Sequence, residues 1–182
     1  GINNTDISKA MFLLGQLNTK DLKTARLELL RKLAPQIKNT EVDPEGRVDF
    51  HIHSIYSDGF WSPAQIVLYA IANGMKAIAL TDHDTLSGVG EALSALDILK
   101  SGLTIYPAAE LSVNMRGVKI KDVKSIRSLH VLAYLPPMNF KEYINWEIKV
   151  KREEFWAYLR VSNPDMHAYT VNLNNLRVFR KA

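Results

Sequence analysis

Short apolar segments alternate with helical segments through the middle of the chain, and this alternation restricts the fold more than any other feature. Residues 76–80 form a nearly continuous apolar run, which is typical of a strand buried in a parallel sheet. Strand followed by helix and strand again predicts βαβ units, and therefore a parallel α/β architecture. We expect strands at 47–52, 76–80, 103–108 and 128–134, and helices at 62–73 and 87–100.

Residues with special roles at helix ends mark the boundaries of these helices. Ser62 is a favourable N-cap residue for the first of them, and Gly74 can adopt the left-handed conformation that ends it. We expect Asp84 or Thr85 to cap the next helix, and Gly102 to follow its end.

The chain divides into three parts by pattern. Residues 1–46 are expected to form a helical hairpin and a polar linker, with Thr19 near the cap of the second helix, and packing or an oligomer contact is the simplest role of this part. Residues 47–135 hold the α/β region. Residues 136–182 hold an amphipathic helix at 140–158, whose aromatic residues indicate core packing more readily than a substrate platform.

Charge and composition narrow the class of protein. A formal net charge of +4 over 182 residues fits an anionic substrate without requiring nucleic acid. The lack of cysteine excludes disulfides and thiolate metal sites. No apolar run approaches the roughly 20 residues of a membrane span, and residues 1–5 do not resemble a signal peptide, so a soluble, cytoplasmic protein is expected.

Two histidines, His51 and His53, stand at the end of the first expected strand. Residues i and i+2 of a strand point to the same face, so both imidazoles are expected to point to one place. Neutral imidazole is a common metal ligand. The pair alone fits either an exposed strand face or a metal site.

Further acidic and imidazole side chains follow the ends of successive expected strands. Taken singly, His83 fits a capping turn between Asp82 and Asp84, one of which is expected to orient its ring, and His130 fits a hydrogen-bonded core histidine. Parallel α/β folds, however, build their sites at the carboxyl ends of strands. Nitrogen and oxygen donors without sulfur suit Zn²⁺, Mn²⁺ or Fe²⁺, and more than four of them indicate two or three ions. The candidate metal ligands are His51, His53, Asp58, His83, Glu110 and His130.

With these residues in place, the chain resembles the PHP (polymerase and histidinol phosphatase) family. The resemblance covers about residues 47–135, and it is greater to small stand-alone members that dephosphorylate nucleotides or degrade short RNA than to polymerase-attached domains. It rests on residues 49–54, 57–59, 62–63, 77–85 and 102–110, with Gly88 and His130.

The resemblance implies a distorted (β/α)7 barrel with a trinuclear metal site and phosphoesterase activity. It also implies a division of the ligands among the ions, with Glu110 bridging and the others grouped as His51 with His53, Asp58 with His83, and His130.

Members of this family take further ligands from the second half of the barrel, for which only 47 residues remain after Leu135. An incomplete barrel is therefore expected in the chain as given. One late Asp-x-His motif, which contains Asp165 and His167, matches the closing motif of the family. Two interpretations stay open: either residues are missing between Tyr134 and Asp165 and the motif supplies the closing ligands, or the protein is truncated and the motif is a turn.

A basic run separates Glu110 from His130. This run fits either a solvated loop or a rim of the site that faces phosphate groups. Arginine binds phosphate better than lysine does, because its planar guanidinium can donate two parallel hydrogen bonds. Arg116 and Arg127 are therefore candidate substrate-binding residues. The run comprises Arg116, Lys119, Lys121, Lys124 and Arg127.

The predicted function is hydrolysis of phosphate esters in nucleotides or short oligonucleotides by a metal-activated water, with two or three Mn, Zn or Fe ions as cofactors. The expected partner is a small phosphorylated substrate, nucleotide or short nucleic acid, and not a membrane. Two alternatives remain: a degenerate or partial module that binds metal, nucleic acid or a protein partner without catalysis, and a histidinol-phosphate phosphatase. The exact substrate, the metal and the oligomeric state do not follow from the sequence.

Overall fold

The computed structural model describes residues 4–37, 41–114 and 128–151. Two helices, α1 and α2, each followed by a short 3-10 turn (Lys20–Leu22 and Ala34–Gln36), precede a four-stranded sheet with three further helices. The elements are α1 (Asn4–Gly15), α2 (Lys23–Leu33), β1 (Val48–Ile52), α3 (Pro63–Ala72), β2 (Ala77–Leu80), α4 (Val89–Leu99), β3 (Thr104–Asn114), β4 (Ser128–Tyr134) and α5 (Phe140–Lys151).

The sheet is mixed, with strand order β1-β2-β3-β4. Strands β1, β2 and β3 are parallel, as the βαβ pattern predicts, but β4 runs antiparallel to β3, so the prediction of a parallel sheet is wrong for the fourth strand. The β3 strand is also longer than expected, because residues 104–107 pair with β2 and residues 108–114 pair with β4. Glu110 therefore lies inside a strand and not at its end.

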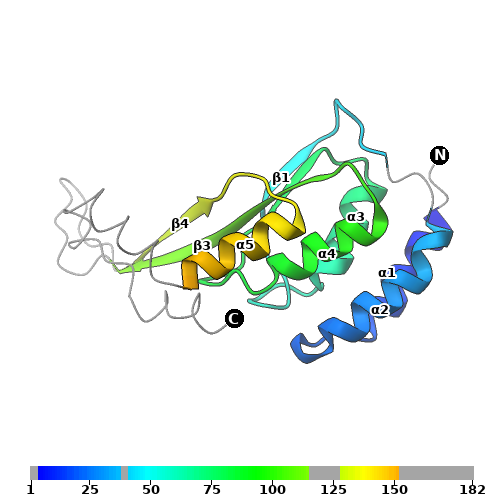
Figure 1. Ribbon diagram of the computed structural model, residues 1–182, viewed down its shortest axis with the longest axis horizontal. Coiled ribbons are helices and arrows are strands. Elements are labelled where there is room, and N and C mark those ends of the chain that lie inside the picture. Colours follow the sequence, from blue (N-terminus) through cyan, green and yellow to red (C-terminus); the bar gives the residue numbers. More distant parts are fainter. Residues whose placement is uncertain (1–3, 38–40, 115–127, 152–182) are drawn as a thin grey trace.

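The helices form layers on one side of this sheet. Figure 1 shows α3, α4 and α5 on one side of the strands, with α1 and α2 beyond α3 and α4. Apolar side chains from α3 and α4, such as Leu68 and Leu93, pack with Ile78, Leu80 and Ile105 of the sheet in one core. Burial of this apolar area is the main force that holds the layers together.

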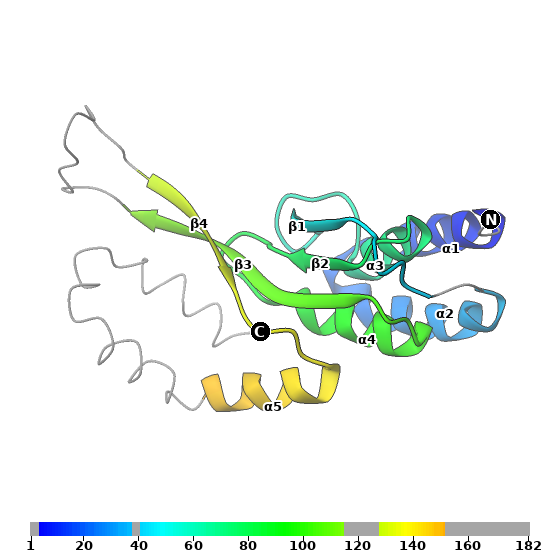
Figure 2. The same cartoon turned by 90° about the horizontal axis from the view of Figure 1, so that it is seen from above.

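The sheet is curled as well as twisted (Figure 2). The hydroxyl of Tyr134 on β4 donates a hydrogen bond of 2.7 Å to the carbonyl of Phe50 on β1, although two strands lie between them in the sheet. The α/β class is thus confirmed, with the sheet curled into a half-barrel. The further strands of a seven-stranded barrel are not found among the residues that the structure describes.

Local sequence explains α3 better than α4. The Ser62 side chain accepts from the Gln65 N–H while the Gln65 side chain accepts from the Ser62 N–H, which is a capping box, and Gly74 has φ +60 as expected. The predicted N-cap of α4, Asp84 or Thr85, is wrong, whereas Gly102 follows the end of the helix as expected. Its N-cap is Gly88 without a side-chain hydrogen bond, and Lys100 adopts the left-handed conformation at its end.

The N-terminal helical hairpin is present as predicted, although Thr19 precedes the 3-10 turn without a capping bond and Leu22 is the N-cap of α2. The predicted helix at 140–158 is observed as α5, and its Tyr143 side chain is buried in the core, while residues 152–158 lie outside the described ranges. No helix in the described part of the chain is long and apolar enough to cross a membrane.

Candidate metal centre

A shift of register in β1 turns His51 toward the concave face of the sheet. Asp49 pairs with Ile78 and Ile52 pairs with Leu80, so β1 carries one extra residue between these pairs. Such a bulge interrupts the alternation of side chains. Phe50 contacts the ring of Tyr106, and its sequence neighbour His51 contacts Glu110, so both point to the face opposite the helices.

Small residues on the central strands make room on this face. Ala79 of β2 lies opposite Tyr106 of β3, and Ala108 of β3 lies opposite Tyr134 of β4. The rings of Phe50, Tyr106 and Tyr134 cluster on this face, and the centroid of Phe50 lies 5.2 Å from that of Tyr106 and 6.1 Å from that of Tyr134. An aromatic wall therefore flanks the histidines.

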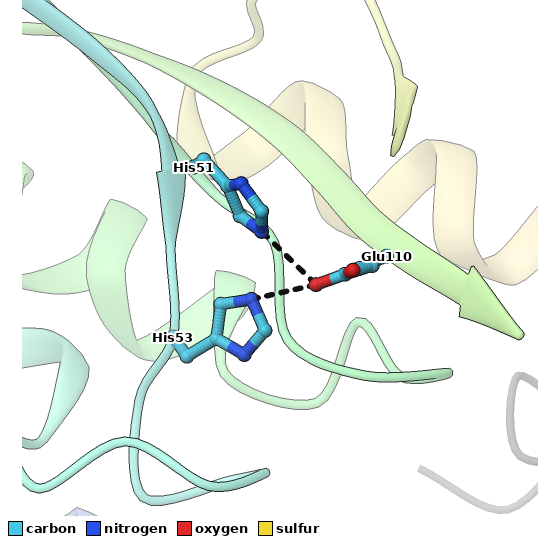
Figure 3. Close-up of side chains that lie close together, drawn as sticks. All are labelled: His51, His53 and Glu110. Atoms are coloured by element: carbon cyan, nitrogen blue, oxygen red, sulfur yellow. Dashed lines mark hydrogen bonds and ion pairs between the residues drawn. The ribbon is translucent and has the colours of Figure 1, made fainter. Parts of the chain in front are cut away.

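Glu110 stands at the centre of the candidate site, only 6% exposed. Its Oε2 atom lies 3.0 Å from Nε2 of His51 and 2.8 Å from Nε2 of His53 (Figure 3), and its Oε1 atom lies 2.9 Å from Nδ1 of His130. His51 in β1 and His53 just after the strand thus face one carboxylate, as their spacing predicts. The interpretation of His130 as a core histidine is wrong, because its side chain is half exposed.

His83 reaches the site because its backbone docks along β3. The Glu110 N–H donates to the carbonyl of Asp82, and the Asp84 N–H donates to the carbonyl of Glu110. Nδ1 of His83 then lies 3.8 Å from Oε2 of Glu110, and the ring lies against those of His53 and His130. Asp84 has a positive φ of 53 in this turn.

Asp58 closes the other side of the site from a tight loop after β1. Its Oδ1 lies 2.6 Å from Nδ1 of His53, and its Oδ2 lies 3.5 Å from Nε2 of His83. Gly59 permits this loop, since a Cβ there would lie 2.1 Å from the carbonyl oxygen of His53. A glycine directly after Asp58 is therefore a steric requirement of this loop.

The aspartates on either side of His83 do not orient its ring, contrary to expectation. Asp82 is buried and accepts three hydrogen bonds of 2.6 Å, from the Ser54 N–H, the Ser54 hydroxyl and the Ser57 hydroxyl. Asp84 accepts from the Ser112 N–H. Asp82 thus holds the loop that carries Asp58, a role that its position beside His83 did not suggest.

Both carboxylates of the site favour the charged form. Burial raises the pKa of Glu110, but hydrogen bonds with His51 and His130 outweigh burial and hold that pKa below its ordinary value. The hydrogen bond with His53 lowers the pKa of Asp58. Two carboxylates near four imidazoles are an arrangement that favours bound cations.

The hydrogen-bonding capacity of His53 tests whether a cation fits. One ring nitrogen faces Asp58 and the other faces Glu110, while a neutral imidazole has only one N–H donor. With a neutral ring, one of the two contacts would bring a nitrogen lone pair against a carboxylate lone pair, which is repulsive. Protonation of the ring, or a cation bound by both atoms, removes this repulsion. The ring nitrogens of His83 face the same two carboxylates at longer distances, 3.5 Å from Asp58 and 3.8 Å from Glu110.

The ligand atoms group into three overlapping sets, in each of which they lie within 4.8 Å of one another. Glu110, His53 and His83 each belong to two sets, so neighbouring ions would share ligands. The sets are His51 with His53 and Glu110, His53 with Asp58 and His83, and His83 with Glu110 and His130. The other candidates, Arg116, Arg127, Asp165 and His167, lie outside the described residues.

The PHP domain model matches residues 49–168, which is more than half of the chain. The chain belongs to the PHP domain family. The match begins at β1, so α1 and α2 precede it.

Three relatives of this PHP chain act on nucleotides or nucleic acids according to their names. The 5'-3' exoribonuclease of Haemophilus influenzae is 39% identical over 72 residues, which cover 39% of this chain and 25% of that protein. The 3',5'-nucleoside bisphosphate phosphatase of Chromobacterium violaceum is 36% identical over 67 residues, 37% of this chain and 23% of that protein. The error-prone DNA polymerase of Cutibacterium acnes is 39% identical over 80 residues, 41% of this chain and 7% of that protein. The matches thus span a quarter or less of the length of these relatives.

Proposed function

We propose that this chain carries the metal centre of a metal-dependent phosphoesterase that hydrolyses phosphate esters of nucleotides or short oligonucleotides. The observation that carries the proposal is the position of Glu110, whose nearly buried carboxylate faces four imidazoles at 2.8–3.8 Å. A structural role alone gives no reason to gather four histidines around one carboxylate.

The three overlapping sets of ligand atoms support two or three divalent ions of the Mn, Zn or Fe type. When bound, such ions activate a water and neutralise charge on a phosphoryl group. In this proposal Glu110 would bridge two ions, His53 and His83 would be shared between neighbouring sets, and Asp58 would belong to one set only. This assignment modifies the simpler division in which His51 and His53 serve one ion alone.

The side chains around the metal centre indicate how the substrate would be held. The aromatic wall of Phe50, Tyr106 and Tyr134 offers faces on which a nucleobase could stack. In our proposal Arg116 and Arg127 contribute to a phosphate-binding rim, and Asp165 and His167 supply closing ligands. The names of the exoribonuclease and the bisphosphate phosphatase agree with a phosphorylated nucleotide or short nucleic acid as substrate.

Metal content and turnover together test this proposal. Protein purified without chelator should contain more than one Mn, Zn or Fe per chain, and added Mn²⁺ should support hydrolysis of a nucleoside 3',5'-bisphosphate or a short RNA. Glu110→Gln should lose metal and activity, whereas Asp97→Asn, which removes the same charge from an exposed position on α4, should keep both. Less than one ion per chain, with no hydrolysis after Mn²⁺ addition, would refute the proposal.

A second candidate function is a partial PHP module that binds metal, nucleic acid or a protein without turnover. The observation that favours it is that the matches span a quarter or less of the length of the relatives. Hydrolysis by wild type that is abolished in His83→Ala would reject this alternative. Histidinol phosphate belongs in the same substrate panel, because the described residues do not distinguish it from a nucleotide.

We also propose that the chain divides into three parts. Residues 1–46 would form an N-terminal helical segment and linker, residues 47–135 the metal-site region, and residues 136–182 a helical insertion and C-terminal segment.

A further inference from the structure

A buried ion pair joins the N-terminal hairpin to the PHP region. Arg26 of α2 and Glu91 of α4 have no exposed side-chain surface, and the guanidinium donates two hydrogen bonds to the carboxylate, at 2.7 and 2.8 Å. The remaining guanidinium nitrogen donates to the backbone carbonyls of Leu17 and Thr19. Arg26 lies before the first residue of the family match and Glu91 lies within it, so this pair links the hairpin to the PHP region.

Glu91 also contacts the loop that carries Asp58. The Tyr56 hydroxyl donates a hydrogen bond of 3.1 Å to Oε2 of Glu91, the oxygen that also accepts from Arg26. Arg26 therefore fixes the position of the carboxylate that Tyr56 needs. A buried carboxylate without its cation would not hold this geometry, because an unpaired buried charge is strongly unfavourable.

From Tyr56 the hydrogen bonds continue to the metal centre. The Tyr56 N–H donates to the Ser54 hydroxyl, which donates to Asp82. Asp82 also accepts from the Ser57 hydroxyl, next to Asp58. A continuous series of contacts thus leads from α2 to the loop at 54–59, and from there to His53 and His83.

A cavity lies beside the hydrogen bond between Tyr56 and Glu91. Tyr56 and Glu91 border a cavity of about 660 Å³ between α2, α4 and α5, which is also lined by Tyr143 and Leu86. The Tyr56 ring borders this cavity and its Cδ2 atom lies near Gly88, so the bond to Glu91 is one of the contacts that orient the ring. Tyr143 also lines this cavity, and its hydroxyl donates to the carbonyl of Leu86, outside the series.

We propose that Arg26 and Glu91, acting through Tyr56, are positioning residues that hold the loop at 54–59 and thereby set Asp58 against His53 and His83. The effect on metal binding rests on the proposed function, whereas the effect on the loop does not. The ion held by His53, Asp58 and His83 should depend on Arg26, and the ion held by His51, His53 and Glu110 should depend on it much less.

The test compares Tyr56→Phe with Tyr143→Phe in the full chain, because each variant loses one hydroxyl at the same cavity. In metal-free protein, hydrogen exchange at the amides of Tyr56, Ser57 and Gly59 should speed up about tenfold in Tyr56→Phe and stay unchanged in Tyr143→Phe. In Mn²⁺ titrations followed by calorimetry, Tyr56→Phe should weaken one ion about tenfold and leave the other affinities near wild type.

The double variant Arg26→Met/Glu91→Leu keeps an apolar contact between α2 and α4 but removes the acceptor of Tyr56. It should show the same faster hydrogen exchange at the loop amides, and the same weaker binding of one ion, that we expect for Tyr56→Phe. Unchanged exchange in both Tyr56→Phe and the double variant would overturn the proposal, as would equal effects of Tyr56→Phe and Tyr143→Phe. If wild type binds no Mn²⁺, the proposed function fails, and the exchange experiment still decides the positioning role.

Discussion

His53 and Glu110 meet across the concave face of the sheet, with Nε2 of the histidine 2.8 Å from Oε2 of the carboxylate. The opposite nitrogen of the same ring lies 2.6 Å from Asp58. A neutral imidazole cannot donate to both carboxylates, so this ring is satisfied only with an added positive charge. This relationship makes cation binding the most direct interpretation of the site.

Metal binding should stabilise the folded chain, because the ligands converge only in the folded state. At a free Mn²⁺ concentration about 100 times the dissociation constant, linkage predicts about 2.7 kcal/mol of stabilisation, or a rise in Tm of roughly 5–10 °C. Differential scanning calorimetry with and without Mn²⁺ measures this shift, and EDTA should reverse it. Glu110→Gln should show a much smaller shift, while an equal shift in that variant would place the ions elsewhere.

Gly59→Ala should disrupt the Asp58 loop. Its Cβ would lie 2.1 Å from the carbonyl oxygen of His53, so the backbone must move, at a cost of about 1–3 kcal/mol and with weaker metal binding. Gly90→Ala on α4 is the matched control, because its Cβ would meet only Tyr143 at 3.9 Å and alanine favours a helix. Urea unfolding compares the two, and equal stabilities would contradict the steric account of the loop.

Replacing Arg26 alone should cost more stability than replacing both members of its ion pair. Arg26→Met leaves the Glu91 carboxylate buried without its cation, which should cost about 3–5 kcal/mol. The double variant Arg26→Met/Glu91→Leu removes both charges and should recover most of that loss. Chemical denaturation of these two variants and of Glu91→Leu completes the double-mutant cycle. A double variant that is no more stable than Arg26→Met would contradict this prediction and would show that the charges themselves stabilise the hairpin.

Alkaline pH should destabilise the fold through Tyr143. Burial, and then the charge of Glu147, raises the pKa of Tyr143 above its ordinary value, so the folded state retains the phenol proton longer than the unfolded chain. The stabilisation is complete below the unfolded pKa of about 10 and is lost as the pH rises toward the higher folded pKa. Unfolding free energies measured between pH 8 and 11 should fall less steeply in Tyr143→Phe, and parallel profiles would contradict this assignment.

Local patterns determined much of the fold before any contact was known. The parallel order of β1, β2 and β3, the capping box at Ser62 and the turn at Gly74 follow from apolar periodicity and helix-end chemistry, which act over a few residues. The spacing of His51 and His53 likewise predicts that they share a face.

Other features depended on partners far away in the chain. The antiparallel direction of β4 places His130 beside Glu110, and the bulge in β1 decides which face receives His51. Asp82 supports a loop 28 residues earlier, and Arg26 pairs with Glu91 across 65 residues.

The sequence by itself thus determined the family, the order of the early elements and the types of side chain available for a metal site. Only the tertiary structure decided that four histidines converge around Glu110 with Asp58 beside them, and that the N-terminal hairpin is tied to the loop that carries Asp58. The physical reason is that periodicity and capping are properties of neighbouring residues, whereas bulges, strand direction and buried ion pairs are settled by contacts between distant segments.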